Sequence, residues 1–180
     1  MALTTFPPGH ASEDASLVRA AREGDERAFG RLYERYARIV HGLLLARAPR
    51  ADVEDPVQDV FLSAWRRLES LRDPSAFGGW LAMIARNRAT DFHRHAVAAV
   101  ELPAELAAVE TNSSRAEALQ ALEVIRSLPE AYRETLVLRL VEGMTGPEIA
   151  DRTGLTAASV RVNLHRGMKL LRRKLERSRP

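Results

Sequence analysis

The segment GMTGPEIADRTGLTAASVRVNLHRGMKLLRRKL, residues 143–175, contains two helical patterns separated by Gly154. In the second pattern, apolar residues recur every three or four positions, which is the spacing of one helical face: Val160, Leu164, Met168, Leu171 and Leu175. Between Thr156, a plausible N-cap, and Arg179 there are eight Lys or Arg residues and one acidic residue. The pattern predicts a helix with an apolar packing face and a basic face.

The first pattern predicts a short helix with a well-marked start. Thr145 stands at the N-cap position, Pro147 lies in the first turn, and Glu148 occupies the capping-box position. Gly154 permits a tight turn, and Leu155 can fill the angle between the two helices. A short helix, a glycine turn and a longer helix form a helix-turn-helix, whose second helix enters the major groove of DNA. A solvated basic helix and a helical hairpin that does not contact DNA are the alternatives.

Composition excludes several classes of protein. The chain of 180 residues has no cysteine, which excludes disulfides, thiolate metal sites and cysteine nucleophiles. No run of about eighteen apolar residues is present, so we expect no membrane insertion. Residues 1–15 lack the charged start and apolar core of a secretory signal, and we expect a disordered tail over residues 1–13. The net charge is only +3, so local segregation of charge matters more than the sum.

Changes in character along the chain predict its domains. Apolar stripes at helical spacing predict a first domain over residues 14–95, with its first helix over residues 14–23 and a loop over residues 71–79. Residues 96–115 are rich in Ala and acidic residues, which is typical of a linker. Helical patterns resume over residues 116–180, and no strand pattern is visible. We therefore predict an all-α protein: two small helical domains joined by a flexible acidic linker.

The chain resembles the extracytoplasmic-function sigma factors of bacteria, group 4 of the RNA polymerase sigma family. The resemblance lies in four segments that follow one another in order: LVRAAREGDERAFGRLYERYA, EDPVQDVFLSAWRRL, AFGGWLAMIARNRATDF and LPEAYRETLVLRLVEGMTGPEIADRTGLTAASVRVNLHRG. Together they cover most of residues 16–95 and 119–175. The resemblance implies a cytoplasmic subunit that directs transcription initiation at promoters, with region 2 over residues 14–95 and region 4 over residues 116–180. It implies no enzymatic activity, cofactor or metal of its own.

For the first domain, the resemblance implies two surfaces. Asp55, Gln58 and Asp59 would bind core RNA polymerase, at the clamp helices of its largest subunit. The loop at residues 71–79 and the helix after it, with Asn87 and Arg88, would read and help to melt the minus-ten promoter element. A flipped base needs amide donors and acceptors, and its backbone needs cations, which these two side chains provide. Two aromatic residues near these surfaces, Phe61 and Trp80, fit core positions better than binding positions.

For the second domain, the resemblance implies that the helix-turn-helix reads the minus-thirty-five promoter element. The candidates are Ser159, Arg161, Asn163, Arg166 and Lys169. Arg can form two hydrogen bonds with guanine and Asn two with adenine. The basic run at residues 172–174 suits phosphate contacts or solubility. The resemblance also implies an anti-sigma factor as a partner, and a linker that either threads the polymerase channel or is an inert spacer.

Some positions depart from the family pattern, and different functions compete with it. Pro56 replaces the usual Leu or Ile of the polymerase-binding helix, and Asn163 stands where the family often has Arg. His93 and His95 suggest a metal site, but residues two apart on a helix point about 200° from each other. Two further functions compete: a stand-alone regulator that uses only the helix-turn-helix, and an adaptor that sequesters another factor.

Overall fold

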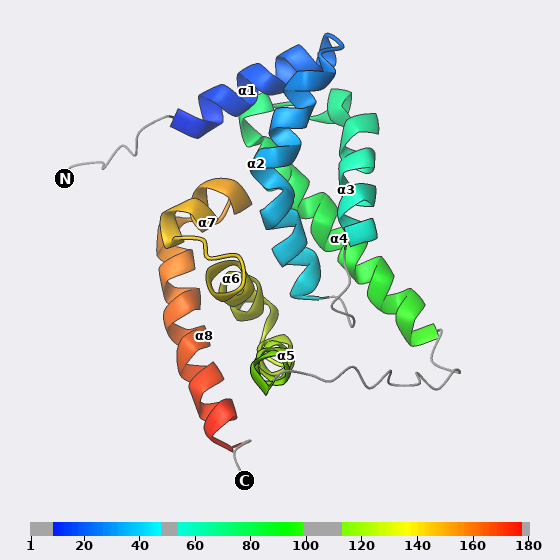
Figure 1. Ribbon diagram of the computed structural model, residues 1–180. Coiled ribbons are helices and arrows are strands. Elements are labelled where there is room, and N and C mark those ends of the chain that lie inside the picture. The colour runs from blue at the N-terminus through cyan, green and yellow to red at the C-terminus, as the bar shows by residue number, and fades with distance from the viewer. Residues whose placement is uncertain (1–8, 48–53, 99–112, 178–180) are drawn as a thin grey trace, which may run out of the picture.

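The computed structural model describes residues 9–47, 54–98 and 113–177, and every regular element among them is helical (Figure 1). In the first half of the chain these are α1 (Gly9–Arg22), α2 (Glu26–Leu45), α3 (Glu54–Arg66), the 3₁₀ turns η1 (Leu68–Ser70) and η2 (Pro74–Ala76), and α4 (Phe77–Ala98). In the second half they are α5 (Ser113–Arg126), α6 (Glu130–Leu140), α7 (Gly146–Thr153) and α8 (Ala157–Arg177).

The first domain is a bundle of α1, α2, α3 and α4 around one apolar core. Leu32, Leu43, Phe77 and Leu81 are among its fully buried side chains. The carboxylate of Asp25 caps α2, accepting hydrogen bonds from two backbone N–H groups of the first turn. The fold follows the predicted apolar stripes, although α1 begins at Gly9, earlier than the helix we expected over residues 14–23.

A buried carboxylate ties α1 to α2. Asp14 is 3% exposed and accepts hydrogen bonds at 2.5 Å from both the Tyr36 hydroxyl and the Arg35 guanidinium. Burial and this contact raise the pKa of Tyr36 far above its usual value, so the phenol stays protonated and donates to Asp14. Burial works to lower the pKa of Arg35, but hydrogen bonds to Glu13 and Asp14 outweigh it and raise the pKa. The cluster fixes the angle between α1 and α2.

The predicted polymerase-binding residues lie on α3, a helix of 13 residues. It ends at Arg66, and Leu68–Ser70 just beyond it form the 3₁₀ turn η1. Pro56 lies in the first turn of α3, where its missing N–H interrupts no helical hydrogen bond. The departure from the family pattern at this position is therefore compatible with a regular helix.

The second domain packs α5, α6 and α7 against α8. Ile149 is fully buried beneath the helix-turn-helix, and Val160 and Leu171 of α8 face the same core. Thr145 and Glu148 form the predicted capping box: the Thr145 hydroxyl accepts from the Glu148 N–H at 3.4 Å, and the Glu148 carboxylate accepts from the Thr145 N–H at 2.7 Å. Gly154 ends α7 with φ +75°, the left-handed conformation that a side chain disfavours. The predicted helix-turn-helix is confirmed.

The two domains lie in direct contact, with α6 against α2 and α7 against α4 (Figure 1). Most of the predicted linker, residues 99–112, lies outside the described residues, as do residues 1–8 of the predicted tail. The helices α4 and α5 end and begin at Ala98 and Ser113 on either side of that segment.

Candidate nucleic-acid and polymerase interfaces

The start of α8 is fixed by its own cap. The Thr156 hydroxyl accepts a hydrogen bond from the Ser159 N–H at 3.1 Å, as the predicted N-cap requires, and lies 2.8 Å from the Ser159 hydroxyl. Ser159 is exposed, but its hydroxyl is within hydrogen-bonding distance of the cap. This contact orients the Ser159 side chain at the end of α8 that enters the groove in a helix-turn-helix.

The candidate base-reading residues of α8 do not all lie on one face. Each residue of a helix is rotated by about 100° from the previous one, so Arg161 and Asn163 point to opposite flanks of α8. Arg161, Arg166 and Lys169 are exposed, whereas Asn163 is half-buried. Arg166 and Lys169 are three residues apart and share the outer face, opposite the buried Val160. Arg161 and Asn163 therefore belong to different flanks of the candidate DNA-reading surface.

Val162 lies on the same outer face and was not among the predicted residues. It is 42% exposed and lies in the N-terminal part of α8, where an apolar side chain of a recognition helix can contact the methyl group of thymine. The apolar stripe of α8 leaves Val162 out, because it is two residues from both Val160 and Leu164. That mismatch with the stripe was the signal in the sequence.

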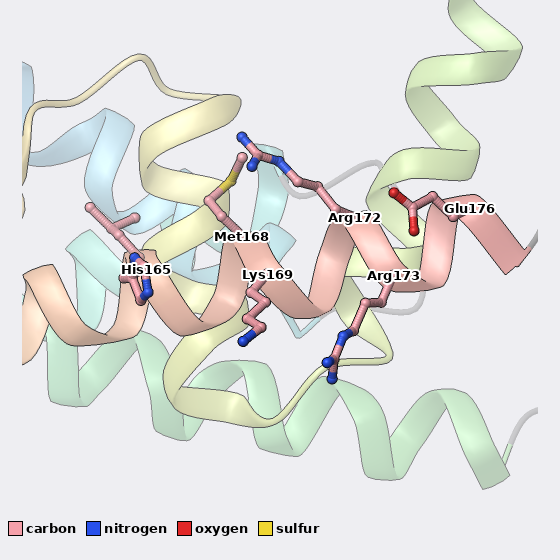
Figure 2. A pocket seen from close by; sticks show the side chains of 7 residues that line it. His165, Met168, Lys169, Arg172, Arg173 and Glu176 are labelled. Atoms are coloured by element: carbon pink, nitrogen blue, oxygen red, sulfur yellow. The ribbon is translucent and has the colours of Figure 1, made fainter.

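The C-terminal half of α8 carries an open hollow of about 620 Å³. Figure 2 shows its lining: Lys169 and Arg173 point to one side of the helix, and Met168 and Arg172 to the other. Arg172, Arg173 and Lys169 are exposed. Arg172 and Arg173 lie beyond the part of a recognition helix that reaches base edges, so contacts with the phosphate backbone suit them better.

In the first domain, the predicted DNA-reading and polymerase-binding residues meet at one groove. Asp59 on α3 forms an ion pair with Arg88 on α4, and both line a hollow of about 510 Å³ between the two helices. Asn87 also lines this hollow and is exposed. Asp55 and Gln58 are exposed, and Asp55 lies four residues before Asp59, so the three share one face of α3.

The aromatic residues of this domain behave largely as expected. Phe61 is 3% exposed, and Trp80 is half-buried and packs against Phe77, with 5.9 Å between ring centroids. Both belong to the core. Leu62 and Trp65 on α3 are exposed by 52% and 37%, and both were missed. Trp65 lies at the edge of the apolar stripe of α3, whereas Leu62 lies outside the stripe, and that mismatch was the signal in the sequence.

The predicted minus-ten loop is locally ordered by Asp73. Its carboxylate accepts hydrogen bonds from the Ser75 hydroxyl at 2.7 Å and the Ser75 N–H at 2.9 Å, and these bonds lower its pKa. The loop leads into α4 through Phe77, which is fully buried. The start of α4 is thus anchored on the core.

Comparison with known proteins assigns the family. The sigma-70 region 2 family model matches residues 32–98, and the model for sigma-70 region 4 matches residues 118–171. The RNA polymerase sigma factor NccH of Alcaligenes xylosoxydans is 32% identical over 93% of this chain and 97% of its own length. The ECF RNA polymerase sigma-E factor of Escherichia coli strain K12 is 32% identical over 91% of this chain and 94% of its own. The chain belongs to the extracytoplasmic-function RNA polymerase sigma factors.

A solved structure supports the same assignment for the fold. The structure described as CnrH in complex with the cytosolic domain of CnrY is 28% identical, covers 92% of this chain and 99% of that chain, and has a TM-score of 0.64. Sigma region 2 accordingly lies within the domain of α1–α4, over residues 32–98, and sigma region 4 within that of α5–α8, over residues 118–171. As a sigma factor, the protein is a transcription initiation factor that directs RNA polymerase to promoter DNA.

Metal binding and membrane insertion find no support within the described ranges. Residues 9–47, 54–98 and 113–177 contain no cluster of three potential metal ligands, although the side chains of His93 and His95 lie outside what the structure describes. Over the same ranges, none of the helices is long and apolar enough to cross a bilayer.

Proposed function

We propose that the sigma factor binds core polymerase through Asp55, Gln58 and Asp59 on α3. These side chains share one helical face, at least two of them are exposed, and a carboxylate-rich face suits a basic partner surface such as the clamp helices of the largest subunit. Leu62 and Trp65, exposed on the same helix, supply apolar area beside the charges.

Promoter reading is divided between the two regions. Asn87 and Arg88, with the loop at residues 71–79, contact the melted minus-ten element, and Ser159, Arg161, Asn163, Arg166 and Lys169 contact the minus-thirty-five element. The observation that carries this division is the capped recognition helix α8, which presents Arg161, Arg166 and Lys169 to solvent. We also propose that the region that reads the minus-ten element extends over residues 14–95 and the region that reads the minus-thirty-five element over residues 116–180.

The cellular setting is also part of the proposal. A subunit that works on the polymerase and carries no cysteine suits the cytoplasm. An anti-sigma factor that covers the polymerase-facing and DNA-facing surfaces is the proposed controller. Because the chain has no thiol, any redox sensing in such a pair would belong to that partner.

Run-off transcription with purified core polymerase tests the proposal. The chain should direct RNA synthesis from a subset of the promoters of its organism, and mapped start sites should lie at a fixed distance from two shared sequence elements. A stand-alone regulator would instead protect duplex promoter DNA without polymerase. Failure to join the core enzyme, combined with such protection, would favour the regulator.

A further inference from the structure

Arg22, the last residue of α1, contacts the chain where the minus-ten loop, residues 71–79, begins. Its guanidinium donates to the backbone carbonyl of Leu68 from both Nε, at 3.3 Å, and Nη2, at 3.0 Å, and Nη2 also donates to the carbonyl of Leu71. Leu68 is the first residue of the 3₁₀ turn η1, and Leu71 follows its last residue. One side chain of α1 therefore spans η1 and reaches the first residue of the loop.

The two carbonyls lie where the chain changes direction. The side chains of Leu68 and Leu71 are 4% and 5% exposed, so both residues are anchored in the core. At Leu71 the backbone becomes extended, with φ −72° and ψ 107°, and the hydrogen bonds of η1 end. A carbonyl that is withdrawn from water without a donor is costly. The side chain of Arg22, which is 21% exposed, provides the donors at this position.

The nearby carboxylate of Glu69 adds little to this contact. It lies 4.0 Å from Arg22 Nε, and its side chain is 79% exposed. An exposed ion pair at that distance contributes little to stability. The contacts that matter are those with the backbone, because they restrain the path of the chain rather than the position of one side chain.

Arginine has the same role at another helix end of this chain. Arg126 of α5 donates to the carbonyl of Leu45 at 3.0 Å, and Leu45 is the last residue of α2. The last carbonyls of a helix have no donor within the helix, and here a distant guanidinium provides one. Because η1 has only three residues, few of its carbonyls find a donor within the turn, and Arg22 serves it in the same way.

Other contacts restrain the rest of the minus-ten loop. The helix α1 packs against η2 as well as against η1, and Phe77, which follows η2, is fully buried. The carboxylate of Asp73 holds the N–H and the hydroxyl of Ser75. The exposed residues between Leu71 and Phe77 are Arg72, Asp73, Ser75 and Ala76. The loop thus presents a short exposed segment between two buried residues, with α1 packed against it.

A loop restrained in this way suits the capture of a flexible single strand. Binding is weaker when the protein segment must become ordered at the same time as its ligand. If a loop adopts its binding conformation for only part of the time, its apparent affinity falls by that fraction. The sigma-70 region 2 family model matches residues 32–98, so α1 lies outside the matched segment. The family match therefore assigns no part in promoter reading to Arg22.

We propose that Arg22 is a positioning residue for minus-ten recognition. By holding the carbonyls of Leu68 and Leu71, it keeps the minus-ten loop in the conformation that binds the melted promoter strand. The inference rests on the proposed function of this loop. Arg22 acts through the loop and not by touching a nucleotide. Its loss therefore weakens capture of the melted strand and leaves the contacts of α3 with polymerase and of α8 with duplex DNA unchanged.

Arg22→Met tests the proposal, with Arg19→Met as the matched control. Methionine keeps an unbranched side chain on α1 but has no N–H donor. Arg19 is exposed and lies in the same last turn of α1. Its variant removes the same charge from the same helix end but leaves the Arg22 guanidinium in place. A difference between the two variants therefore reports on the hydrogen bonds and not on the charge.

Holoenzyme binding is measured by fluorescence anisotropy on two templates from a promoter that run-off transcription has mapped. One is a duplex that ends upstream of the minus-ten element, and the other is a fork whose minus-ten non-template strand is unpaired. For Arg22→Met we expect about tenfold lower affinity for the fork, which corresponds to a loop that is in its binding conformation about a tenth of the time. The affinities for the duplex and for core polymerase should match those of Arg19→Met.

A conservative variant and a second measurement complement this test. Arg22→Lys has a single charged group in place of a planar fork of donors, so its affinity for the forked template should fall less, by about threefold. In the isolated chain, the N–H of Leu71 donates to the Leu68 carbonyl at 3.2 Å. Its hydrogen exchange should be about tenfold faster in Arg22→Met than in wild type, whereas the N–H groups of α3 should keep their rates.

The outcomes separate this inference from the proposed function. If wild-type holoenzyme binds the fork no more tightly than a fork of scrambled sequence, the proposed function of the loop fails, and this inference with it. If wild type prefers the correct fork but Arg22→Met binds it as tightly as Arg19→Met, or exchange at Leu71 is unchanged, only the inference is overturned. If Arg22→Met does not fold, Arg22→Lys carries the same comparison. An equal fall in polymerase affinity and fork affinity would indicate a general loss of structure and would also overturn it.

Discussion

The cations of α4 and α8 are prepared for DNA in different ways. On α8, the side chains of Arg161, Arg166 and Lys169 extend into solvent. On α4, Arg86 is held by Glu134 of region 4 and Arg88 by Asp59 of α3. Nucleic acid can approach α8 directly, whereas on α4 it must replace carboxylates that already hold the cations. Region 4 therefore resembles a ready duplex-binding surface, and region 2 one that becomes available only after other contacts change.

The largest effect should come from reversing the charge of an exposed arginine on α8. Arg166→Glu removes a candidate base contact worth about 1–3 kcal/mol and adds repulsion against phosphate, so transcription should fall about a hundredfold. Association with core polymerase, measured by fluorescence titration, should be unchanged. Arg177→Glu, an exposed residue in the last turn of α8, is the matched control and should have a much smaller effect. Equal loss of promoter selection and polymerase association would contradict the division between α8 and α3.

A smaller effect is expected from breaking the ion pair between Asp59 of α3 and Arg88 of α4. Asp59→Asn removes a candidate polymerase contact and releases Arg88. We expect about a tenfold lower affinity for core polymerase. An effect of this size is typical of removing a charge at the rim of an interface, and removing one partner of a buried ion pair would cost more. Glu69→Gln, an exposed carboxylate just beyond α3, serves as the control. If Asp59 only restrains Arg88, polymerase affinity will stay constant and promoter affinity of the holoenzyme will rise instead.

The salt dependence of promoter binding should distinguish positioning contacts from reading contacts. Arg173→Gln on α8 should reduce the slope of log K against log salt concentration by about 1 and weaken all promoters alike. Arg161→Gln should instead change the ranking of promoter sequences. Titrations of holoenzyme with several promoter sequences at several salt concentrations measure both the salt slope and the ranking of promoters. A change in ranking caused by Arg173→Gln would place that residue among the base-reading groups.

The smallest effect concerns the stability of the helix that supports α8. Thr145→Ala removes the N-cap of α7 and should lower the free energy of unfolding of region 4 by about 1 kcal/mol, as measured by thermal denaturation. Thr90→Ala on α4 is the control in region 2, because the Thr90 hydroxyl bonds only to the carbonyl of Arg86 within its own helix. A larger effect from Thr90→Ala would show that α4, rather than α7, depends on its threonine.

The capping box formed by Thr145 and Glu148 should make the stability of region 4 depend on pH. Hydrogen bonds from the N–H and hydroxyl of Thr145 lower the pKa of Glu148 below that of a free carboxyl group. The stabilisation is therefore complete above the unfolded pKa and disappears as the pH falls through the lowered, folded value. Glu148→Gln should be less stable than wild type at pH 7, and the difference should vanish in strong acid. A difference that persists there would mean that the charge of Glu148 is unimportant.

Local features of the structure were predictable from the sequence. The cap at Thr145 and Glu148, the left-handed Gly154 and the packing stripe of α8 depend on neighbours within a few residues, and the structure confirms them. The burial of Phe61 followed from helical spacing in the same way. These features require only the geometry of one helix or one turn, which a single sequence contains.

The contact between the regions was not predicted, because its physical basis is not local. Glu134 and Glu142 read as ordinary solvated acids on a helix, and their partners Arg86 and His41 are 48 and 101 residues away in the chain. Gly42 reads only as a weak helix former until Leu138 is placed against it. Similarly, the half-buried state of Asn163 depends on how α8 rotates over its core, which periodicity fixes only approximately.

The hydrogen bond from Arg126 to the carbonyl of Leu45 cannot form early in the synthesis of the nascent chain. The two residues are 81 positions apart, so at about 5–20 residues per second the ribosome makes Arg126 roughly 4–16 s after Leu45. During that interval water must satisfy the last carbonyls of α2. The last helix of region 2 ends at Ala98, 28 residues before Arg126, so region 2 is synthesised before the part of region 4 that supplies this hydrogen bond.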